Sequence, residues 1–277
     1  MPAIRIDGLL TLFCISGKSK DEMKIGVYGL GRFGSFWSGL LAKSHEVKAY
    51  TRNPQRPTPP GVERVSEGVL LDQPVVFICT SISSFDVVIR RISGRLPEGA
   101  LLMDTCSVKV YPAEIMRKHV PERVDLLATH PMFGPDSAMG GLEGLPMILC
   151  PVRISNQGTS EWQTFFSSLG LRVHTMSPRE HDYKAAYTQG ITHYVGRVLA
   201  DLGLQQSNLG TLGYKKLLEI MDQTCNDPWQ LFLDLQRYNP YTKQMRQNLH
   251  SSLTRMLEKL ECSLDIPEAA KYDKNEE

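Results

Sequence analysis

The sequence predicts an α/β fold in which a mostly parallel sheet, with helices on both faces, is followed by a domain made only of helices. Two observations support this prediction. Between residues 23 and 176, short apolar runs alternate with helical stretches, as they do in parallel sheets joined by crossover helices. After residue 176 the pattern is helical throughout. We therefore place the domain boundary near residue 176.

The first domain, residues 23–176, opens with a βαβ unit. The apolar run KIGVYGLG predicts a strand, FGSFWSGLLAK a helix and HEVKAYTRN a second strand. Helical stretches such as FDVVIRRISGRL separate the later strands. These strands are expected in the runs PVVFICTS, ALLMDTCS, DLLATHPMFG, MILCPV and LRVHTM.

The second domain, residues 177–265, begins with a strong helix signal. Ser177 is a good N-cap, Pro178 suits the first helical position, and Glu180 follows the cap by three residues. Helices are expected at residues 178–203, 211–224, 228–237 and 240–262.

The two ends of the chain carry weaker signals. Residues 1–22 are expected to form a loosely ordered extension, unless Met23 is the true start. Their run GLLTLFCISG resembles a short signal peptide, but it lacks a small-x-small cleavage site, so export is disfavoured. The charged tail, residues 266–277, is expected to fray.

Composition excludes several classes of partner. The formal net charge is +1, from 31 basic and 30 acidic residues, which leaves no excess for nucleic acid or an anionic membrane. No apolar run reaches the roughly 18 residues of a membrane span. The six cysteines lie far apart with no CxxC pair, as reduced thiols do in cytosolic proteins. We expect a cytoplasmic protein that binds a small anionic molecule and no metal.

A glycine motif identifies the first domain as a Rossmann-like, dinucleotide-binding domain. The motif GLGRFG follows a predicted strand and opens a helix, which is the context that the GxGxxG fingerprint requires. The glycines allow a tight turn, close approach of a pyrophosphate and close helix packing, while the helix N-terminus attracts the phosphates. The expected cofactor contacts in this motif are Gly29, Gly31, Arg32, Phe33 and Gly34.

The end of the second strand favours NADP over NAD. NAD enzymes usually place an acidic residue there for the ribose hydroxyls, whereas this chain has AYTRN. Thr51 and Arg52 can bind a 2′-phosphate instead, although Arg52 could also be a solvated loop residue. Thr80, at the end of a later strand, is a further expected cofactor contact.

Reactive side chains follow two neighbouring strands. Ser107 and Lys109 lie in MDTCSVK, just past one strand, and His130 lies in THPMFGP, just past the next. Because ligands bind beyond the carboxyl ends of such strands, a hydroxyl and an imidazole are expected to meet beside the nicotinamide. The alternatives are a turn-capping serine, a solvated lysine and an ordinary loop histidine. On the long helix, Gln189 and His193 share a face with Arg197.

The ordered set GLGRFG, DTCSVK, THPMFGP and EHDYKAAYTQGITH resembles the arogenate/prephenate dehydrogenase family of tyrosine biosynthesis. The resemblance covers most of residues 23–262, and THYVGRVL and RYN look more like its plant-type arogenate branch. It implies oxidative decarboxylation of arogenate or prephenate with hydride transfer to the cofactor. It also implies that the helical domain is a dimerisation domain, which pairs two chains into a homodimer.

The resemblance assigns roles to the candidate residues. His130 acts on the substrate's 4-hydroxyl as C4 gives up hydride, a task suited to an imidazole with an ordinary pKa of about 6.5. Ser107 hydrogen-bonds the same hydroxyl or the nicotinamide ring. Gln189, His193 and Lys109 are expected to contact substrate, whereas Arg197 holds an inter-helix or dimer contact.

Asp227 bears on the choice of substrate. It lies twelve residues before Asn239, a register that resembles plant-type enzymes in which an aspartate favours the amine substrate. Arogenate, which carries an ammonium, is therefore favoured over prephenate. The alternative is a helix cap, because Asn-Asp-Pro is an ordinary helix start.

Two other kinds of protein share the cofactor motif. A β-hydroxyacid or imine dehydrogenase would need a lysine acid on the long helix, but Lys184 lies off the face of Gln189 and His193. A dinucleotide sensor without catalysis would not need Ser107 and His130. Both are kept as less favoured alternatives.

Overall fold

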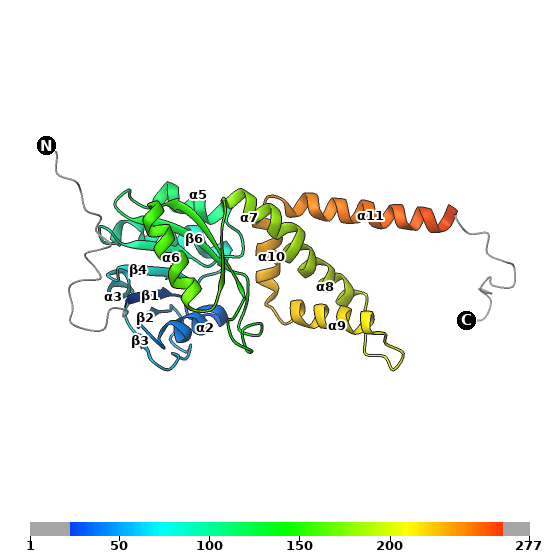
Figure 1. Cartoon of the computed structure of the whole chain (residues 1–277), viewed down its shortest axis with the longest axis horizontal. Helices are drawn as coiled ribbons and strands as arrows, with labels where there is room; N and C mark the ends of the chain where they lie inside the picture. The colour runs from blue at the N-terminus through cyan, green and yellow to red at the C-terminus, as the bar shows by residue number, and fades with distance from the viewer. Residues whose placement is uncertain (1–22, 263–277) are drawn as a thin grey trace.

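The structure is a computed structural model, and it describes residues 23–262. An eight-stranded sheet flanked by helices leads into a group of helices that extends away from it (Figure 1). The expectations for residues 1–22 and 266–277 lie outside the described residues.

Six strands of the sheet form its parallel part, in the order β3-β2-β1-β4-β5-β6. This order reverses between β1 and β4, which is where dinucleotides bind in such sheets. The strands are β1 (Lys24–Tyr28), β2 (Glu46–Tyr50), β3 (Val62–Arg64), β4 (Val75–Ile78), β5 (Leu101–Asp104) and β6 (Asp125–Pro131).

The other edge of the sheet is mixed. β7 (Pro146–Arg153) pairs antiparallel with β6, and β8 (Arg172–Thr175) pairs parallel with β7. The predicted mostly parallel sheet is confirmed. β3 was not predicted from the sequence, because this three-residue edge strand is largely exposed and has no apolar run.

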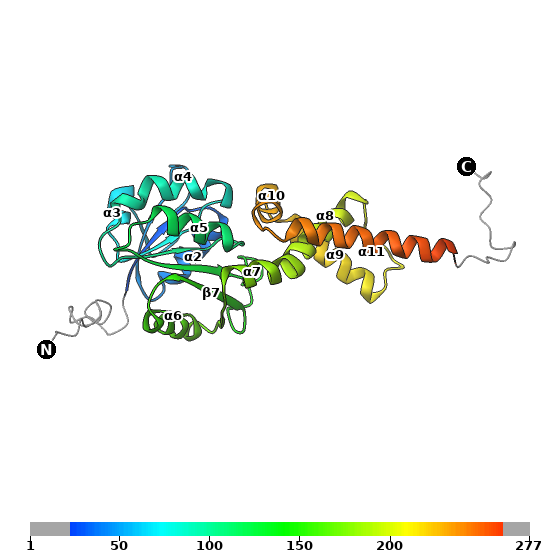
Figure 2. The same ribbon diagram turned by 90° about the horizontal axis from the view of Figure 1, so that it is seen from above.

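Helices cover both faces of the sheet (Figure 2). One face packs against α3 (Glu67–Leu71), α4 (Ile82–Ile92) and α5 (Val110–His119). The other packs against α2 (Arg32–Leu41) and α6 (Asn156–Ser168). Trp37 of α2 is fully buried in this second core, stacked on Phe33 with ring centroids 5.7 Å apart. This packing fixes α2, and with it the glycine loop, against the sheet.

The helical region consists of α7 to α11. Ser177 accepts a hydrogen bond from the backbone of Glu180 at 3.2 Å, as expected of the N-cap of α7. The predicted long helix is interrupted by a π-helical turn, η2, which the sequence pattern did not reveal. The elements are α7 (Pro178–Ala185), η2 (Ala186–Gly190), α8 (Ile191–Asp201), α9 (Leu212–Cys225), α10 (Trp229–Tyr238) and α11 (Thr242–Cys262).

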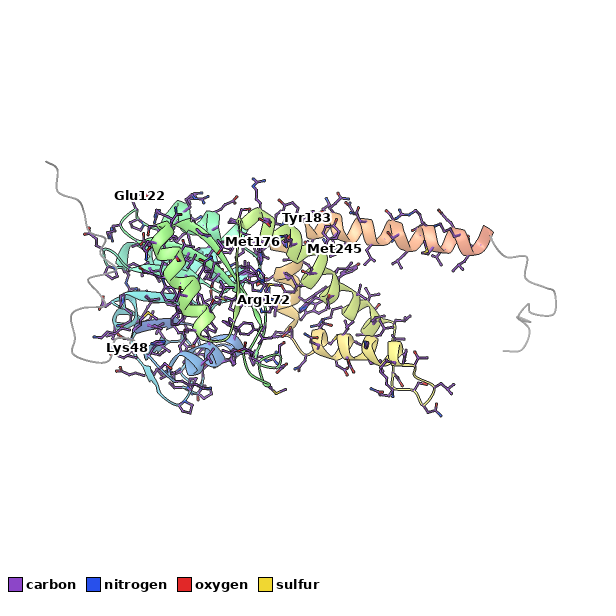
Figure 3. All side chains as sticks on the ribbon, in the orientation of Figure 1. Lys48, Glu122, Arg172, Met176, Tyr183 and Met245 are labelled. Carbon is purple, nitrogen blue, oxygen red and sulfur yellow. The ribbon has the colours of Figure 1, made fainter. Side chains whose placement is uncertain are left out.

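α10 returns to the sheet, whereas α11 points away from it (Figure 1). Asp234 of α10 is buried and accepts hydrogen bonds at 3.0 Å from both the backbone and the hydroxyl of Ser83, in the first turn of α4. Figure 3 labels Met176, Tyr183 and Met245 along the junction between sheet and helices. Among residues 23–262, no helix is both long and apolar enough to span a membrane.

Candidate active site

The glycine loop between β1 and α2 leaves space for a ligand at one position only. A Cβ on Gly29, where φ is +108°, would lie 2.5 Å from the Cys79 carbonyl oxygen, and one on Gly34 would lie 1.9 Å from that of Gly29. A Cβ on Gly31 would meet no atom within 4 Å. Gly29 and Gly34 are therefore needed for packing, while Gly31 keeps the N-terminus of α2 open to a phosphate.

Two hydroxyl groups near this loop are buried without a partner. Thr80 follows β4 and Ser107 follows β5, and neither hydroxyl oxygen has a hydrogen bond within the described residues. Buried polar groups in proteins are nearly always hydrogen-bonded. Together with the open space at Gly31, these hydroxyls fit a bound dinucleotide and substrate.

The loop after β2 carries the residues predicted to select the cofactor. Thr51 accepts a hydrogen bond from the backbone of Asn53 at 3.3 Å, and Arg52 is exposed. Arg64 of β3 donates to the carbonyls of Asn53 at 2.9 Å and Pro54 at 3.1 Å. Arg64 thereby holds this loop in place, and its position depends on β3, which was not predicted from the sequence.

His130 stands at the head of a buried chain of hydrogen bonds. It lies at the end of β6, and its Nδ1 is 2.9 Å from Nε2 of His181. Nδ1 of His181 is 2.8 Å from the Asp182 carboxylate. That carboxylate also accepts from the backbone amides of Lys109 at 2.6 Å and Val110 at 2.9 Å, where α5 begins.

This chain of hydrogen bonds determines which nitrogen of His130 can accept a proton. An ionised carboxylate only accepts hydrogen bonds, so His181 carries its proton on Nδ1 and accepts on Nε2. His130 then donates from Nδ1, which leaves the lone pair on Nε2. Burial, His181 and the Lys109 charge lower the pKa of His130 well below its usual 6.5. His130 is therefore a neutral base near pH 7.

His181 and Asp182 belong to the motif EHDYKAAYTQGITH, but no role was predicted for either residue from the sequence. Burial lowers the pKa of His181, and its hydrogen bond to Asp182 opposes that effect. The only sequence signal was a histidine next to an aspartate in the first turns of a helix, and its meaning depends on a contact with β6.

Lys109 lies behind the site. Its side chain is completely buried, forms an ion pair with Asp104 and donates to the carbonyl of Thr129 at 2.5 Å. The ammonium is thus already paired within the protein, and the expected contact of Lys109 with substrate stays a prediction. Its charge also acts on His130 through space.

The face predicted on the long helix has two parts. Oε1 of Gln189 and Nδ1 of His193 are buried without a partner in the described residues. Arg197 instead donates to the carbonyls of Thr224 at 3.1 Å and Asp227 at 2.7 Å. The ligand contacts of Gln189 and His193 stay predictions, whereas Arg197 joins α8 to the end of α9 and to the residues that follow it.

Asp227 lies between the glycine loop and α8. One carboxylate oxygen accepts from Arg32 at 2.9 Å, and the other is 3.9 Å from Nε2 of His193. The N-cap of α10 is Pro228, and no side chain caps this helix. The helix-cap alternative for Asp227 therefore finds no hydrogen bond to support it.

The structure has an open cavity of about 800 Å³ whose lining includes Asp136 and Asn226. It lies between the loop after β6 and the end of α9. Its lining consists of Asp136, Ser137, Met139, Asp222, Gln223, Cys225 and Asn226. Among residues 23–262, no cluster of three or more His, Cys, Asp or Glu side chains could hold a metal ion.

Gly31→Ala should weaken dinucleotide binding, whereas Gly34→Ala should destabilise the fold. Gly31→Ala adds a methyl group to open space, so the melting temperature should stay unchanged while the dinucleotide Kd rises by about one to two decades, as expected for lost charged hydrogen bonds. Gly34→Ala should destabilise the fold by about 1–3 kcal/mol or more, because it overpacks the loop. Calorimetry and fluorescence titration check both results, and a destabilised Gly31→Ala with unchanged affinity would contradict this reading.

Stability should fall as the pH drops below about 6.5. Folded His130 stays neutral, whereas the unfolded chain binds its proton near pH 6.5, so the loss begins there on acidification and is absent above it. His130→Gln should reduce the slope of stability against pH by up to about 1.4 kcal/mol per unit. Urea unfolding between about pH 5.5 and 7.5 measures this. The exposed His174→Gln serves as the control, and equal slopes in both variants would count against a neutral, buried His130.

Two parts of the chain match known protein families. Residues 44–174 match "Prephenate dehydrogenase, nucleotide-binding domain", and residues 198–271 match "TYRAAT1-like, C-terminal domain". Solved structures share the fold. The A. aeolicus prephenate dehydrogenase has a TM-score of 0.70 at 18% identity, covering 86% of this chain and 90% of that one. The Synechocystis arogenate dehydrogenase has a TM-score of 0.62 at 19% identity, covering 86% and 93%.

Two curated relatives come from Arabidopsis thaliana. "Arogenate dehydrogenase 1, chloroplastic" is 35% identical over 250 residues, which is 85% of this chain and 39% of that protein. "Arogenate dehydrogenase 2, chloroplastic" is 33% identical over 248 residues, which is 84% of this chain and 68% of that protein. The chain thus spans less than half of the first relative and about two thirds of the second. With this identity over most of its length, the chain belongs to the arogenate/prephenate dehydrogenase family.

Proposed function

We propose that the protein catalyses the oxidative decarboxylation of arogenate, and less efficiently of prephenate, with NADP as hydride acceptor. The buried chain from His130 through His181 to Asp182 carries this proposal, because it supplies a neutral, oriented base close to the strand ends where a dinucleotide binds. A β-hydroxyacid or imine dehydrogenase is less favoured, because Lys184 is exposed and paired with Glu180 at 2.7 Å. A non-catalytic sensor would not need this chain of hydrogen bonds.

The residues divide the chemistry among them. A bound nicotinamide supplies the acceptor for the hydride from C4. Nε2 of His130 takes the proton of the 4-hydroxyl as the carbonyl forms, and Asp182 stabilises the resulting charge through His181. The ring carboxylate then leaves as carbon dioxide, and its bonding electrons make the ring an aromatic phenolate, whose oxygen takes the proton back from His130. Ser107, whose hydroxyl lacks a partner in the described residues, would hold the substrate hydroxyl or the nicotinamide.

The cofactor preference rests on the loop after β2. Thr51 and the exposed Arg52 can receive a 2′-phosphate, and Arg64 fixes the loop that carries them. The A. aeolicus structure is described with NAD+, so NAD remains the alternative for the family fold.

Thr51→Asp with Arg52→Ala should shift the preference from NADP toward NAD. The double change removes the phosphate contacts and adds an acceptor for the ribose hydroxyls. Losing a charged hydrogen bond of roughly 1.5–3 kcal/mol should reduce kcat/KM with NADP by about one to two decades. Steady-state rates with both cofactors measure the shift. A parent enzyme that already prefers NAD would contradict the assignment.

The substrate preference rests on Asp227. Its carboxylate lies beside His193 and is not a helix cap in the structure, so it is placed to attract the ammonium of arogenate. Prephenate has a keto acid in place of that ammonium. Two relatives are named arogenate dehydrogenases, which supports the same choice.

We further propose that two chains form a homodimer through the helical region. Large apolar side chains are exposed along it, and such surfaces commonly mark interfaces. They include Val198, Leu202, Leu212, Leu253, Met256, Leu257 and Leu260. The cytoplasmic location stays a prediction from the sequence, and the two Arabidopsis relatives are named chloroplastic.

Reduction of NADP by the purified protein, followed by nicotinamide absorbance with arogenate or prephenate, tests the function directly.

Asp227→Asn should lower kcat/KM for arogenate and raise it for prephenate, changing the ratio by about one to two decades. His130→Ala should lower turnover by about 10²–10⁴-fold with nearly unchanged cofactor affinity. If neither substrate is turned over, the proposal fails; if Asp227→Asn leaves the ratio unaltered, the arogenate preference fails alone.

A further inference from the structure

Arg32 connects the glycine loop to two other parts of the chain. It is the first residue of α2, directly after Gly31. One guanidinium nitrogen donates to Asp227 at 2.9 Å, and another pairs with Asp136, in the loop that follows His130. Asn226 also donates to Asp136 at 2.8 Å. The cofactor loop is thereby held to the connection between α9 and α10.

The same guanidinium lies next to the place where a pyrophosphate would bind. Gly31 has open space around it, and the N-terminus of α2 has no side-chain cap. Carboxylates and phosphates are alternative partners for the planar donor edge of arginine. A dinucleotide therefore competes with Asp136 and Asp227 for Arg32.

The exposure of these groups allows such an exchange of partners. The side chains of Arg32, Asp136 and Asp227 are 37%, 48% and 27% exposed. Ion pairs this accessible to water contribute little stability. Opening them leaves no buried charge unpaired, in contrast to the fully buried pair of Lys109 and Asp104.

Asp227 faces both ligand sites at once. While Arg32 holds one of its oxygens, the negative charge that faces His193 is neutralised. We infer that Arg32 is a specificity-determining residue that couples the two sites: it masks Asp227 in the ligand-free enzyme, and a dinucleotide pyrophosphate draws it away, so that Asp227 can receive a substrate ammonium. This inference rests on the proposed function and adds cooperative binding of the two ligands.

The first test is the affinity of the full chain for NADPH without substrate, measured by fluorescence titration. Asp227→Asn and Asp136→Asn each release Arg32 from one carboxylate, so each should tighten NADPH binding by about two- to fivefold. NADH should show the same change, because the pyrophosphate is common to both. Asp222→Asn is the matched control, since Asp222 is an exposed acid lining the same cavity with no bond to Arg32.

The second test combines substitutions at both ends of the ion pair. In an Arg32→Gln background, Asp227→Asn should leave the NADPH Kd unchanged, because the guanidinium that links them is gone. Arg32→Gln alone should weaken NADPH binding and tighten arogenate binding measured by calorimetry without cofactor. Melting temperatures of all variants should stay close to the parent's, since these groups are solvent-accessible.

The outcomes separate this inference from the function it rests on. Equal effects of Asp227→Asn and Asp222→Asn on NADPH affinity would show that charge alone acts, and would overturn the coupling. So would an effect of Asp227→Asn that persists in the Arg32→Gln background. Failure to turn over arogenate would instead remove the proposed function, and the NADPH titrations would still report whether Arg32 couples to Asp227.

Discussion

The carboxylate of Asp182 is the contact on which the site depends. It is completely buried, on the first helix of the helical region, and it accepts two backbone amides at the start of α5 as well as the proton of His181. The amides at a helix N-terminus favour a negative charge, so the carboxylate is stable there without a cation. One side chain therefore joins the helices to the sheet and sets the tautomer of the base. Asn239 reinforces the joint by donating to the Asp182 carbonyl at 2.8 Å.

The buried ion pair of Lys109 and Asp104 also affects the charge of His130. Lys109 and Asp104 neutralise each other, and Asp104 is also held by the backbone amides of Cys106 at 2.9 Å and Thr129 at 3.1 Å. Because Asp104 makes these other bonds, the ammonium of Lys109 is fixed close to the end of β6, where it disfavours a positive charge on His130. The base is thus kept neutral by burial, by His181 and by the fixed cation of Lys109 together.

The features that depend on residues close together in the sequence could be predicted from it. The glycine loop, the Ser177 cap and most strands follow from local sterics and periodicity, which the chain carries in consecutive positions. Three other features could be recognised only in the folded structure. β3 has too few apolar residues to be detected, and η2 changes the helical register without a proline. The burial of the Lys109 side chain depends on its ion pair with Asp104, at the end of β5.

The role of His181 and the ion pair between Asp227 and Arg32 could not be predicted from the sequence, for the same reason. Each contact joins residues that are far apart along the chain, His181 with His130 and Asp227 with Arg32. Spacing along one helix could place Gln189 and His193 on a common face, but it could not show that Arg197 would turn to the carbonyls of Thr224 and Asp227.

The described residues near the site differ in how well their polar groups are satisfied. The groups that hold the base in place are buried and fully hydrogen-bonded, so they are rigid before any ligand arrives. Four of the residues expected to touch ligands have a buried polar atom without a partner in the described residues, namely Thr80, Ser107, Gln189 and His193. Each such group costs the fold about 1–3 kcal/mol. A ligand that supplies one of the missing hydrogen bonds recovers that free energy, so these groups favour ligands with polar atoms in the matching positions.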